Sequence, residues 1–225
     1  MKFGVVRFPG SCDEVDAQLA AERMGDAELL WHSERDLRGT DAVIVPGGFS
    51  YGDYLRVGAI ARFAPVMEAV AQFAREGGLV LGICNGFQVL CEAGLLPGAL
   101  LPNEGLRFIC RQVDCVVVEH DTAFTQACGP EARLSIPVKH TTGRYYAPQV
   151  ILDDMQAHGQ IVLRYAPGCN PNGSEADIAG VRSREGNVFG LMPHPEHAVD
   201  ALTGSTDGLR IFASMRDNVE GLVAA

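Results

Sequence analysis

The fold of this chain is decided by the segment GLVLGICNGFQVL, residues 78–90. Its first part, Leu79 to Ile83, is a short apolar run of the kind that forms a strand buried on both faces. The residues after Asn85 have helical character, so Cys84 falls where a strand turns into a helix. Such a strand–turn–helix unit is typical of α/β proteins with a parallel sheet.

Two glycines, Gly82 and Gly86, flank Cys84 in a G-x-C-x-G pattern. This is the cysteine counterpart of the G-x-S-x-G nucleophile elbow, where side chains two residues before and after the nucleophile would collide. The elbow would place the thiol at the carboxyl edge of the sheet, where the amides of the following helix favour a thiolate. The alternative is a buried structural cysteine beside loop glycines, since free cysteines are often buried.

The composition favours one domain that acts on a small solute. The chain has 225 residues, 47% of them hydrophobic, and a formal net charge of -10, so we expect a single domain over residues 1–225. An acidic protein repels phosphate backbones and anionic lipids, which argues against nucleic acid and membrane partners. The sequence has no apolar run of the roughly 20 residues that a span needs, and no signal-peptide pattern, so we expect a cytoplasmic location.

The seven cysteines include no C-x-x-C pair. Without such spacing, neither a disulfide framework nor a zinc site is expected, and we assign no metal to the chain.

Predicted strands and helices alternate through the first half of the sequence. Short apolar or branched runs predict strands at 2–8, 27–31, 41–46 and 79–83. One helix is predicted to open at Ser11–Glu14, which has the spacing of a capping box, and to run to about Met24, and a second is predicted over the apolar positions from Ile60 to Phe73. Helices between strands with short connections predict a parallel sheet covered on both faces.

The second half of the sequence has a different pattern, with few predicted helices. Between residues 107 and 182, β-rich segments at 113–119, 134–138, 161–165 and 178–182 are separated by Gly, Pro and Asn clusters. A further strand at 187–192 and a helix at about 207–219 close the sequence. The expected fold is therefore a three-layer α/β architecture, with a mostly parallel central sheet, helices on both faces and an antiparallel extension in the second half.

A cysteine nucleophile needs a base and a group that orients that base. The turn PHPE, residues 193–196, offers both, because the two prolines hold His194 on a stiff turn and Glu196 is within reach of its ring. In a parallel sheet, strand ends that are distant in sequence can lie side by side, so His194 could face Cys84. Each of these residues alone has an ordinary structural explanation, and the pattern rests on their combination.

The turn PGGF, residues 46–49, also follows a predicted strand. Its glycines allow backbone N–H groups to face inward, and with the amide of Asn85 they form a candidate oxyanion hole. His140 could line the same cleft, but we interpret it as a structural histidine. His197 lacks the flanking prolines and is given no role.

These residues resemble the class I, triad-type glutamine amidotransferases, whose nucleophile and base motifs are similar to residues 82–88 and 193–196. Within that superfamily, the sequence is most similar to the glutaminase subunits of phosphoribosylformylglycinamidine synthase, in purine biosynthesis. The resemblance extends from the first strand to the last through FPGSCD (8–13), PGGFSYGDYLRVGA (46–59), NPNGS (170–174), IAG (178–180) and GLMPHPE (190–196).

The resemblance implies that Cys84 forms a γ-glutamyl thioester with L-glutamine and that the released ammonia passes to a separate synthetase subunit. His194 would be the base and acid, and Glu196 would orient it. The same resemblance implies two oxyanion donors and a substrate contact, which are Gly48, Asn85 and Gln88.

The resemblance also implies partners. It indicates a complex with a large synthetase subunit, which uses Mg-ATP, and with a small accessory subunit, while this chain carries no cofactor and has low activity alone. The polar, glycine-rich loop from Ser50 to Gly58 is the expected partner or regulatory contact.

One stretch departs from the family pattern. Where the family usually has AHGEG before Arg-Tyr, residues 139–143 read KHTTG. His140 is kept, but the acidic position is Thr142, so the role of that acid in binding glutamine or docking a partner is not assigned here.

Two other functions fit parts of the sequence. A cysteine hydrolase of the related elbow-bearing α/β group resembles the chain near Cys84, but such enzymes commonly have a histidine where this chain has Asn85. That function would also leave the turn at 193–196 unexplained. A binding module with a silent site would have lost Cys84, His194 or Glu196, and all three are present.

Overall fold

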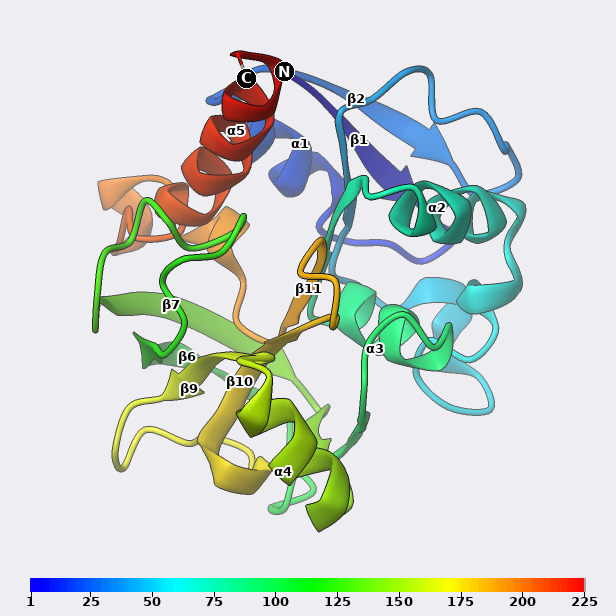
Figure 1. Cartoon of the computed structure of the whole chain (residues 1–225). Coiled ribbons are helices and arrows are strands. Elements are labelled where there is room, and N and C mark those ends of the chain that lie inside the picture. Colours follow the sequence, from blue (N-terminus) through cyan, green and yellow to red (C-terminus); the bar gives the residue numbers. More distant parts are fainter. Residues whose placement is uncertain (225) are drawn as a thin grey trace.

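The structure is a computed structural model that describes residues 1–224, and its centre is a nine-stranded sheet (Figure 1). The strand order is β2-β1-β3-β4-β11-β10-β9-β6-β7. The strands are β1 (Lys2–Arg7), β2 (Asp26–Trp31), β3 (Ala42–Val45), β4 (Leu79–Ile83), β6 (Ile109–Val117), β7 (Arg133–His140), β9 (Ile161–Tyr165), β10 (Ile178–Arg182) and β11 (Val188–Leu191). A separate antiparallel pair is formed by β5 (Ala99–Pro102) and β8 (Thr142–Tyr146).

The sheet changes direction at β11. Strands β2, β1, β3, β4 and β11 pair in parallel, whereas β10, β9, β6 and β7 continue the sheet by antiparallel pairing. The predicted α/β fold with an antiparallel extension in the second half is confirmed. Every residue of β3 and of β4 is buried, as expected for central strands of a parallel sheet covered on both faces.

Helices cover the parallel part of the sheet on both faces. The helices are α1 (Glu14–Glu22), α2 (Pro65–Arg75), α3 (Asn85–Glu92), α4 (Gln149–Ala157) and α5 (Leu209–Ala224). Figure 1 shows α1 and α5 on one side of the parallel strands and α2 and α3 on the other. Fully buried side chains such as Val70 and Phe212 fill the two interfaces, and each contributes about 1.5–3 kcal/mol relative to an exposed position.

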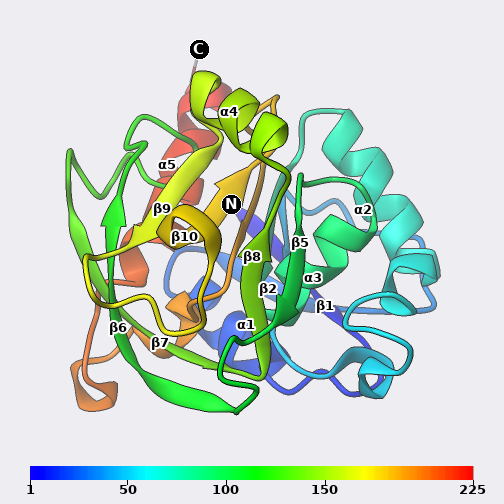
Figure 2. The ribbon, with the colours of Figure 1, turned by 90° about the horizontal axis from the view of Figure 1, so that it is seen from below.

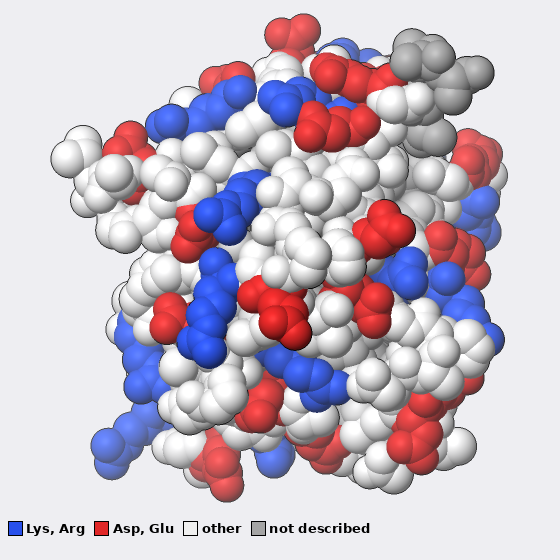
Figure 3. Space-filling model, turned by 60° about the vertical axis from the view of Figure 1, so that its left-hand side comes forward, with Lys and Arg blue, Asp and Glu red and all other residues white. Residues whose placement is uncertain are grey.

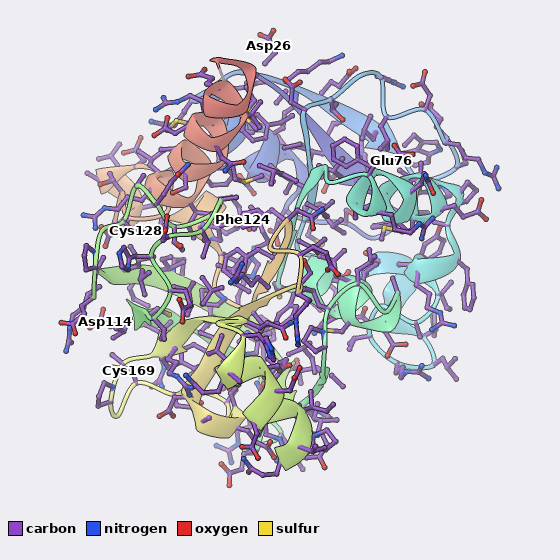
Figure 4. The ribbon with its side chains drawn as sticks, in the orientation of Figure 1. Asp26, Glu76, Asp114, Phe124, Cys128 and Cys169 are labelled. Carbon is purple, nitrogen blue, oxygen red and sulfur yellow. The ribbon has the colours of Figure 1, made fainter. Side chains whose placement is uncertain are left out.

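The antiparallel half has its own buried side chains. Phe124 packs against Phe189 of β11 with ring centroids 5.3 Å apart, and Figure 4 shows Phe124 near the middle of the molecule. Seen from below, β5 lies beside β8, with α4 close to β9 (Figure 2). On the face of the described residues in Figure 3, acidic and basic side chains are interspersed, and neither sign forms a continuous surface.

The structure corrects two local predictions and adds elements that were not predicted. Ser11 does not cap α1, because its hydroxyl accepts a hydrogen bond from the Phe8 N–H at 3.0 Å, and the helix begins only at Glu14. The second helix begins at Pro65, so Phe63 lies outside it and is exposed. Helix α4 and the β5–β8 pair were not predicted, because their apolar positions are too few to give a clear period. None of the helices in residues 1–224 has both the length and the apolar composition of a membrane span.

Candidate active site

Cys84 occupies a sharp turn between β4 and α3. Its φ is +50°, in the left-handed region that a non-glycine residue seldom adopts. A Cβ on Gly82 would lie 2.9 Å from the backbone of Gly86, and a Cβ on Gly86 would overlap the Val45 carbonyl oxygen. Both glycines are therefore required by close backbone approach, as in a nucleophile elbow.

The parallel pairing of β4 with β11 brings the second motif to the same edge. Leu191 is in register with Ile83, and the Cys84 N–H donates to the Leu191 carbonyl at 2.8 Å. The chain then turns through Met192 and Pro193 to His194, whose backbone N–H donates to the Pro137 carbonyl at 2.8 Å. Cys84 and His194 consequently line one cavity, although 110 residues separate them in the sequence.

The imidazole of His194 is wholly buried and oriented by Glu196. Its Nδ1 lies 2.6 Å from Glu196 Oε1, and the Glu196 carboxylate is itself buried. Nε2 has no hydrogen bond within the described residues, and His194 lines the cavity with Cys84. Burial alone would lower the pKa of His194, but the negative charges of Glu196 and Cys84 outweigh it and raise the pKa to about 10.

The two predicted oxyanion donors, the backbone amides of Gly48 and Asn85, have free N–H groups within residues 1–224. Gly48 has φ +143°, a backbone conformation that favours glycine, and a Cβ at this position would lie 2.7 Å from the Cys12 nitrogen. Its neighbour Phe49 donates to the Gly10 carbonyl at 2.9 Å, whereas the Gly48 and Asn85 N–H groups make no hydrogen bond within residues 1–224. Gly48 and Cys84 both line the cavity.

The side chains of Asn85 and Gln88 hold the loop and strand around the cavity. Asn85 Oδ1 accepts from the Ser50 N–H at 3.1 Å, and its Nδ2 donates to Asp53 Oδ1 at 3.2 Å and to Gln88 Oε1 at 2.9 Å. Gln88 Nε2 donates to the Thr142 carbonyl at 2.5 Å. Each end of the Gln88 amide thus has one internal partner and keeps one further proton or lone pair for a ligand.

A group that the sequence interpretation missed lies behind His194. Asp13 is buried and pairs with the Lys139 ammonium, and its carboxylate lies 3.4 Å from His197 Nε2 and 3.7 Å from His194 Nδ1. Burial would raise the pKa of Asp13, but His197, His194 and Lys139 together lower it well below its usual range. The position of Asp13 in the sequence could have indicated its role, because it follows β1 at the edge of the sheet where the other parallel strands also end.

The same four side chains offer ligand atoms to a metal ion. One atom each from Asp13, His194, Glu196 and His197 all lie within 4.8 Å of one another. Nitrogen and carboxylate ligands suit divalent transition metals. These atoms already bond to one another and to the Lys139 ammonium, so their close spacing is explained by the hydrogen-bond network, and the assignment of no metal stays a prediction.

The altered stretch KHTTG lies along the cavity. His140, Thr141 and Thr142 all line it, and the Cys84 sulfur lies 3.9 Å from the Lys139 carbonyl. His140 is buried, and burial together with the nearby charge of His194 lowers its pKa to about 4. The interpretation of His140 as a satisfied structural histidine is incomplete, because its Nδ1 has no partner within the described residues.

The other cysteines lack these surroundings. Burial raises the pKa of Cys91 and Cys115 far above the usual range, and that of Cys128 to about 11. Figure 4 shows Cys128 and Cys169 on the side of the antiparallel strands, away from α3. Cys12 does line the cavity, but burial and the adjacent Asp13 raise the pKa of its thiol.

Comparison with known proteins gives relatives over nearly the whole length. Subunit PurQ of phosphoribosylformylglycinamidine synthase from Mycolicibacterium paratuberculosis is 59% identical over 220 residues, covering 97% of each chain. Its counterpart from Rubrobacter xylanophilus is 59% identical over 216 residues, covering 96% of this chain and 97% of the relative. A chain in the structure of PurLQS from Thermotoga maritima superposes with a TM-score of 0.89 at 43% identity, covering 97% of this chain and 98% of that chain.

The family model of the CobB/CobQ-like glutamine amidotransferase domain matches residues 1–217. That match covers the elbow, the turn at 193–196 and the whole central sheet. The chain belongs to the CobB/CobQ-like glutamine amidotransferase family.

Proposed function

We propose that this chain is the glutaminase subunit of phosphoribosylformylglycinamidine synthase, which hydrolyses L-glutamine and supplies ammonia to a synthetase subunit in purine biosynthesis. The observation that carries the proposal is the convergence of Cys84 and the His194–Glu196 pair on one cavity. Full-length similarity to the PurQ subunits supports the choice of pathway.

The chemistry follows from the positions of the groups. His194 takes the Cys84 proton, and the thiolate attacks the amide carbon of glutamine. The carbonyl oxygen becomes an oxyanion that the Gly48 and Asn85 N–H groups stabilise. The imidazolium of His194 then protonates the departing nitrogen, so ammonia leaves and a γ-glutamyl thioester remains on Cys84.

The second half of the reaction uses the same groups. A water molecule loses a proton to His194 and attacks the thioester, and the collapse of the second oxyanion releases glutamate and the Cys84 thiolate. Glu196 holds the imidazole through Nδ1 and stabilises the imidazolium. Gln88 is proposed as a substrate contact through the proton and lone pair that its internal bonds leave free.

The ammonia acceptor would dock at the mouth of this cavity. Phe49 and Phe108 line the cavity and are about half exposed. On the loop whose Asp53 and Val57 also line the cavity, Tyr54 and Leu55 are 74% and 86% exposed, and Leu55 has φ +72°. An apolar side chain held in the left-handed region and in water suggests a surface that a partner covers, which supports the assignment of the 50–58 loop to the synthetase contact.

We propose that this chain works within a complex of three kinds of subunit. The large synthetase subunit would bind Mg-ATP and the small accessory subunit would complete the assembly, with no cofactor on this chain. Residues 1–225 would act as one glutamine amidotransferase domain, since strands from both halves of the sequence share one sheet. The cytoplasm is the proposed compartment, in keeping with the full-length similarity to the PurQ subunits.

An electrophilic glutamine analogue tests the site assignment. Incubated with the assembled complex, a diazoketone analogue of glutamine should label this chain once, at Cys84, and excess glutamine should protect it. The exposed thiol of Cys110, which does not line the cavity, serves as an internal control for unspecific alkylation. Peptide mass mapping that places the protected label on any other cysteine would overturn the choice of nucleophile.

A further inference from the structure

We infer that His140 is a specificity-determining residue, whose Nδ1–H donates a hydrogen bond to the α-carboxylate of the amino-acid substrate. This inference rests on the proposed function and adds to it a contact at the end of the substrate remote from Cys84. It is carried by the hydrogen bonds of Asn172, by an unpaired buried nitrogen and by the position of the ring on the cavity.

The neighbours of Asn172 fix the orientation of its amide. Its Oδ1 accepts from the Ser174 N–H at 3.0 Å and from the Ser174 hydroxyl at 2.7 Å. Its Nδ2 lies 2.8 Å from the Gly143 carbonyl, which can only accept. The nitrogen of this amide is therefore a donor on the side that faces His140.

The orientation of Asn172 determines the tautomer of His140. Asn172 Nδ2 lies 3.0 Å from His140 Nε2, so Nε2 must be the acceptor and carries no proton. Burial and the charge of His194 hold the pKa of His140 near 4, which keeps the ring neutral at physiological pH. A neutral imidazole without a proton on Nε2 has it on Nδ1.

This Nδ1–H is a buried donor without a partner. Nδ1 makes no hydrogen bond within residues 1–224, and His140 is only 4% exposed. A Cβ on Gly143 would overlap the Cδ2 and Nε2 atoms of the ring, so the Nε2 edge of the ring faces Gly143. Nδ1 is on the other edge of the ring, and His140 lines the cavity with Cys84, Gln88 and His194. Unpaired buried donors are rare in folded proteins, and the cavity can supply the missing acceptor.

The chemistry of glutamine identifies that acceptor. Two groups of free glutamine accept hydrogen bonds well, the side-chain amide oxygen and the α-carboxylate. The amide oxygen lies against the Gly48 and Asn85 N–H groups during the proposed reaction. The α-carboxylate is then the group left for a donor elsewhere on the cavity wall, and a neutral Nδ1–H can bind it with a charge-assisted bond.

A pair of substitutions separates this role from packing. The side-chain amide of His140→Gln can place an oxygen near the Nε2 position and accept from Asn172, but has no donor at the Nδ1 position. In His140→Asn the amide nitrogen lies near the Nδ1 position, so the donor to the cavity is kept and the bond to Asn172 is lost. His120→Gln, which changes an exposed histidine, is the matched control.

We expect His140→Gln to raise the KM for glutamine in the assembled complex by about 10- to 100-fold, the effect of losing one hydrogen bond to a charged group. His140→Asn should recover much of that loss, kcat should change less than KM, and His120→Gln should match the unsubstituted chain. An equal KM in His140→Gln and the unsubstituted chain would overturn the inference. If the unsubstituted complex fails to use glutamine at all, the proposed function fails instead.

A spectroscopic measurement provides a second readout. With ¹⁵N-labelled histidine, the His140 signals, assigned by comparison with His140→Gln, should show a protonated Nδ1 and an unprotonated Nε2. Addition of glutamine to Cys84→Ser should then shift the Nδ1 signal. A proton on Nε2, or an Nδ1 signal that glutamine leaves unmoved, would contradict the assigned role.

Discussion

At the scale of single residues, the two carboxylates beside His194 differ in distance and in role. Glu196 lies 2.6 Å from Nδ1 and orients the ring, whereas Asp13 lies 3.7 Å away and is neutralised by Lys139. The nearer, unneutralised charge therefore dominates the proton affinity of the imidazole.

Glu196→Gln should shift the alkaline limb of the pH profile. The pKa of His194 is raised to about 10 because Glu196 and Cys84 outweigh burial. Without the carboxylate, burial prevails, and His194 should lose its proton about one to three pH units lower. The kcat/KM for glutamine, measured from pH 6 to 10.5, should fall at correspondingly lower pH. Ammonia-dependent synthesis by the same complex serves as the control, and an alkaline limb at the same pH in both proteins would contradict this assignment.

Asp13→Asn should cost stability in a pH-dependent way. A carboxylate with a lowered pKa in the folded chain stabilises the fold above its unfolded pKa of about 3.9, and this stabilisation is lost as the pH falls below that value. We expect a loss of about 1–3 kcal/mol in unfolding free energy at pH 7. The difference from the unsubstituted chain, measured by urea denaturation, should shrink between pH 4 and pH 3. A difference that stays constant over this range would show that Asp13 has no charge-dependent role.

At the scale of elements, the site depends on the packing of α3 against the ends of β3 and β4. Gly86 is the second residue of α3 and lies against the end of β3, where the Val45 carbonyl leaves no room for a side chain. The close approach fixes the position of the helix N-terminus and so of the free Asn85 N–H.

Gly86→Ala should therefore destabilise the fold by about 3 kcal/mol or more, because the added Cβ would clash with the carbonyl oxygen and carbon of Val45, and these backbone atoms cannot move aside easily. Gly105→Ala is the control, because a Cβ there meets no atom within 4 Å, and its effect should stay within about 0.5 kcal/mol. Thermal and urea unfolding followed by circular dichroism measure both. A Gly86→Ala protein as stable as Gly105→Ala would refute the elbow geometry.

The elements near the elbow could be predicted from sequence, because their signals are local. The apolar run at 79–83 and the glycines around Cys84 fix a strand and a turn without reference to distant residues. Pairing is not local, so the contact of Asp13 with Lys139, 126 residues later, had no signal in either segment. His140 shows the same limit, because its unpaired nitrogen depends on where Asn172 folds back to meet it.

At the scale of the whole molecule, the exposed apolar side chains at the cavity are Phe49 and Phe108, which line it, and Tyr54 and Leu55 on the 50–58 loop, and we propose that together they form the contact surface for the synthetase. Ammonia released inside the cavity must reach a second active site before it is lost to water. A synthetase seated on this surface would close the mouth and receive it. This placement explains how a small hydrolase domain could serve a larger reaction.

Leu55→Asp should weaken binding to the synthetase, because a charge replaces an apolar side chain at the centre of the proposed contact. Leu202→Asp is the matched control, since Leu202 is also almost fully exposed but lies outside this surface. Size-exclusion chromatography of the mixed subunits should show a loss of complex with Leu55→Asp and none with Leu202→Asp. Equal complex formation by the two variants would remove the 50–58 loop from the interface.

The central claim is that Cys84 releases ammonia from glutamine for use elsewhere in the complex. The most direct measurement is product synthesis by the assembled complex containing Cys84→Ser, supplied either with glutamine or with ammonium chloride. We predict that synthesis from glutamine disappears and that synthesis from ammonium chloride continues at the rate of the unsubstituted complex. Continued synthesis from glutamine would contradict the claim.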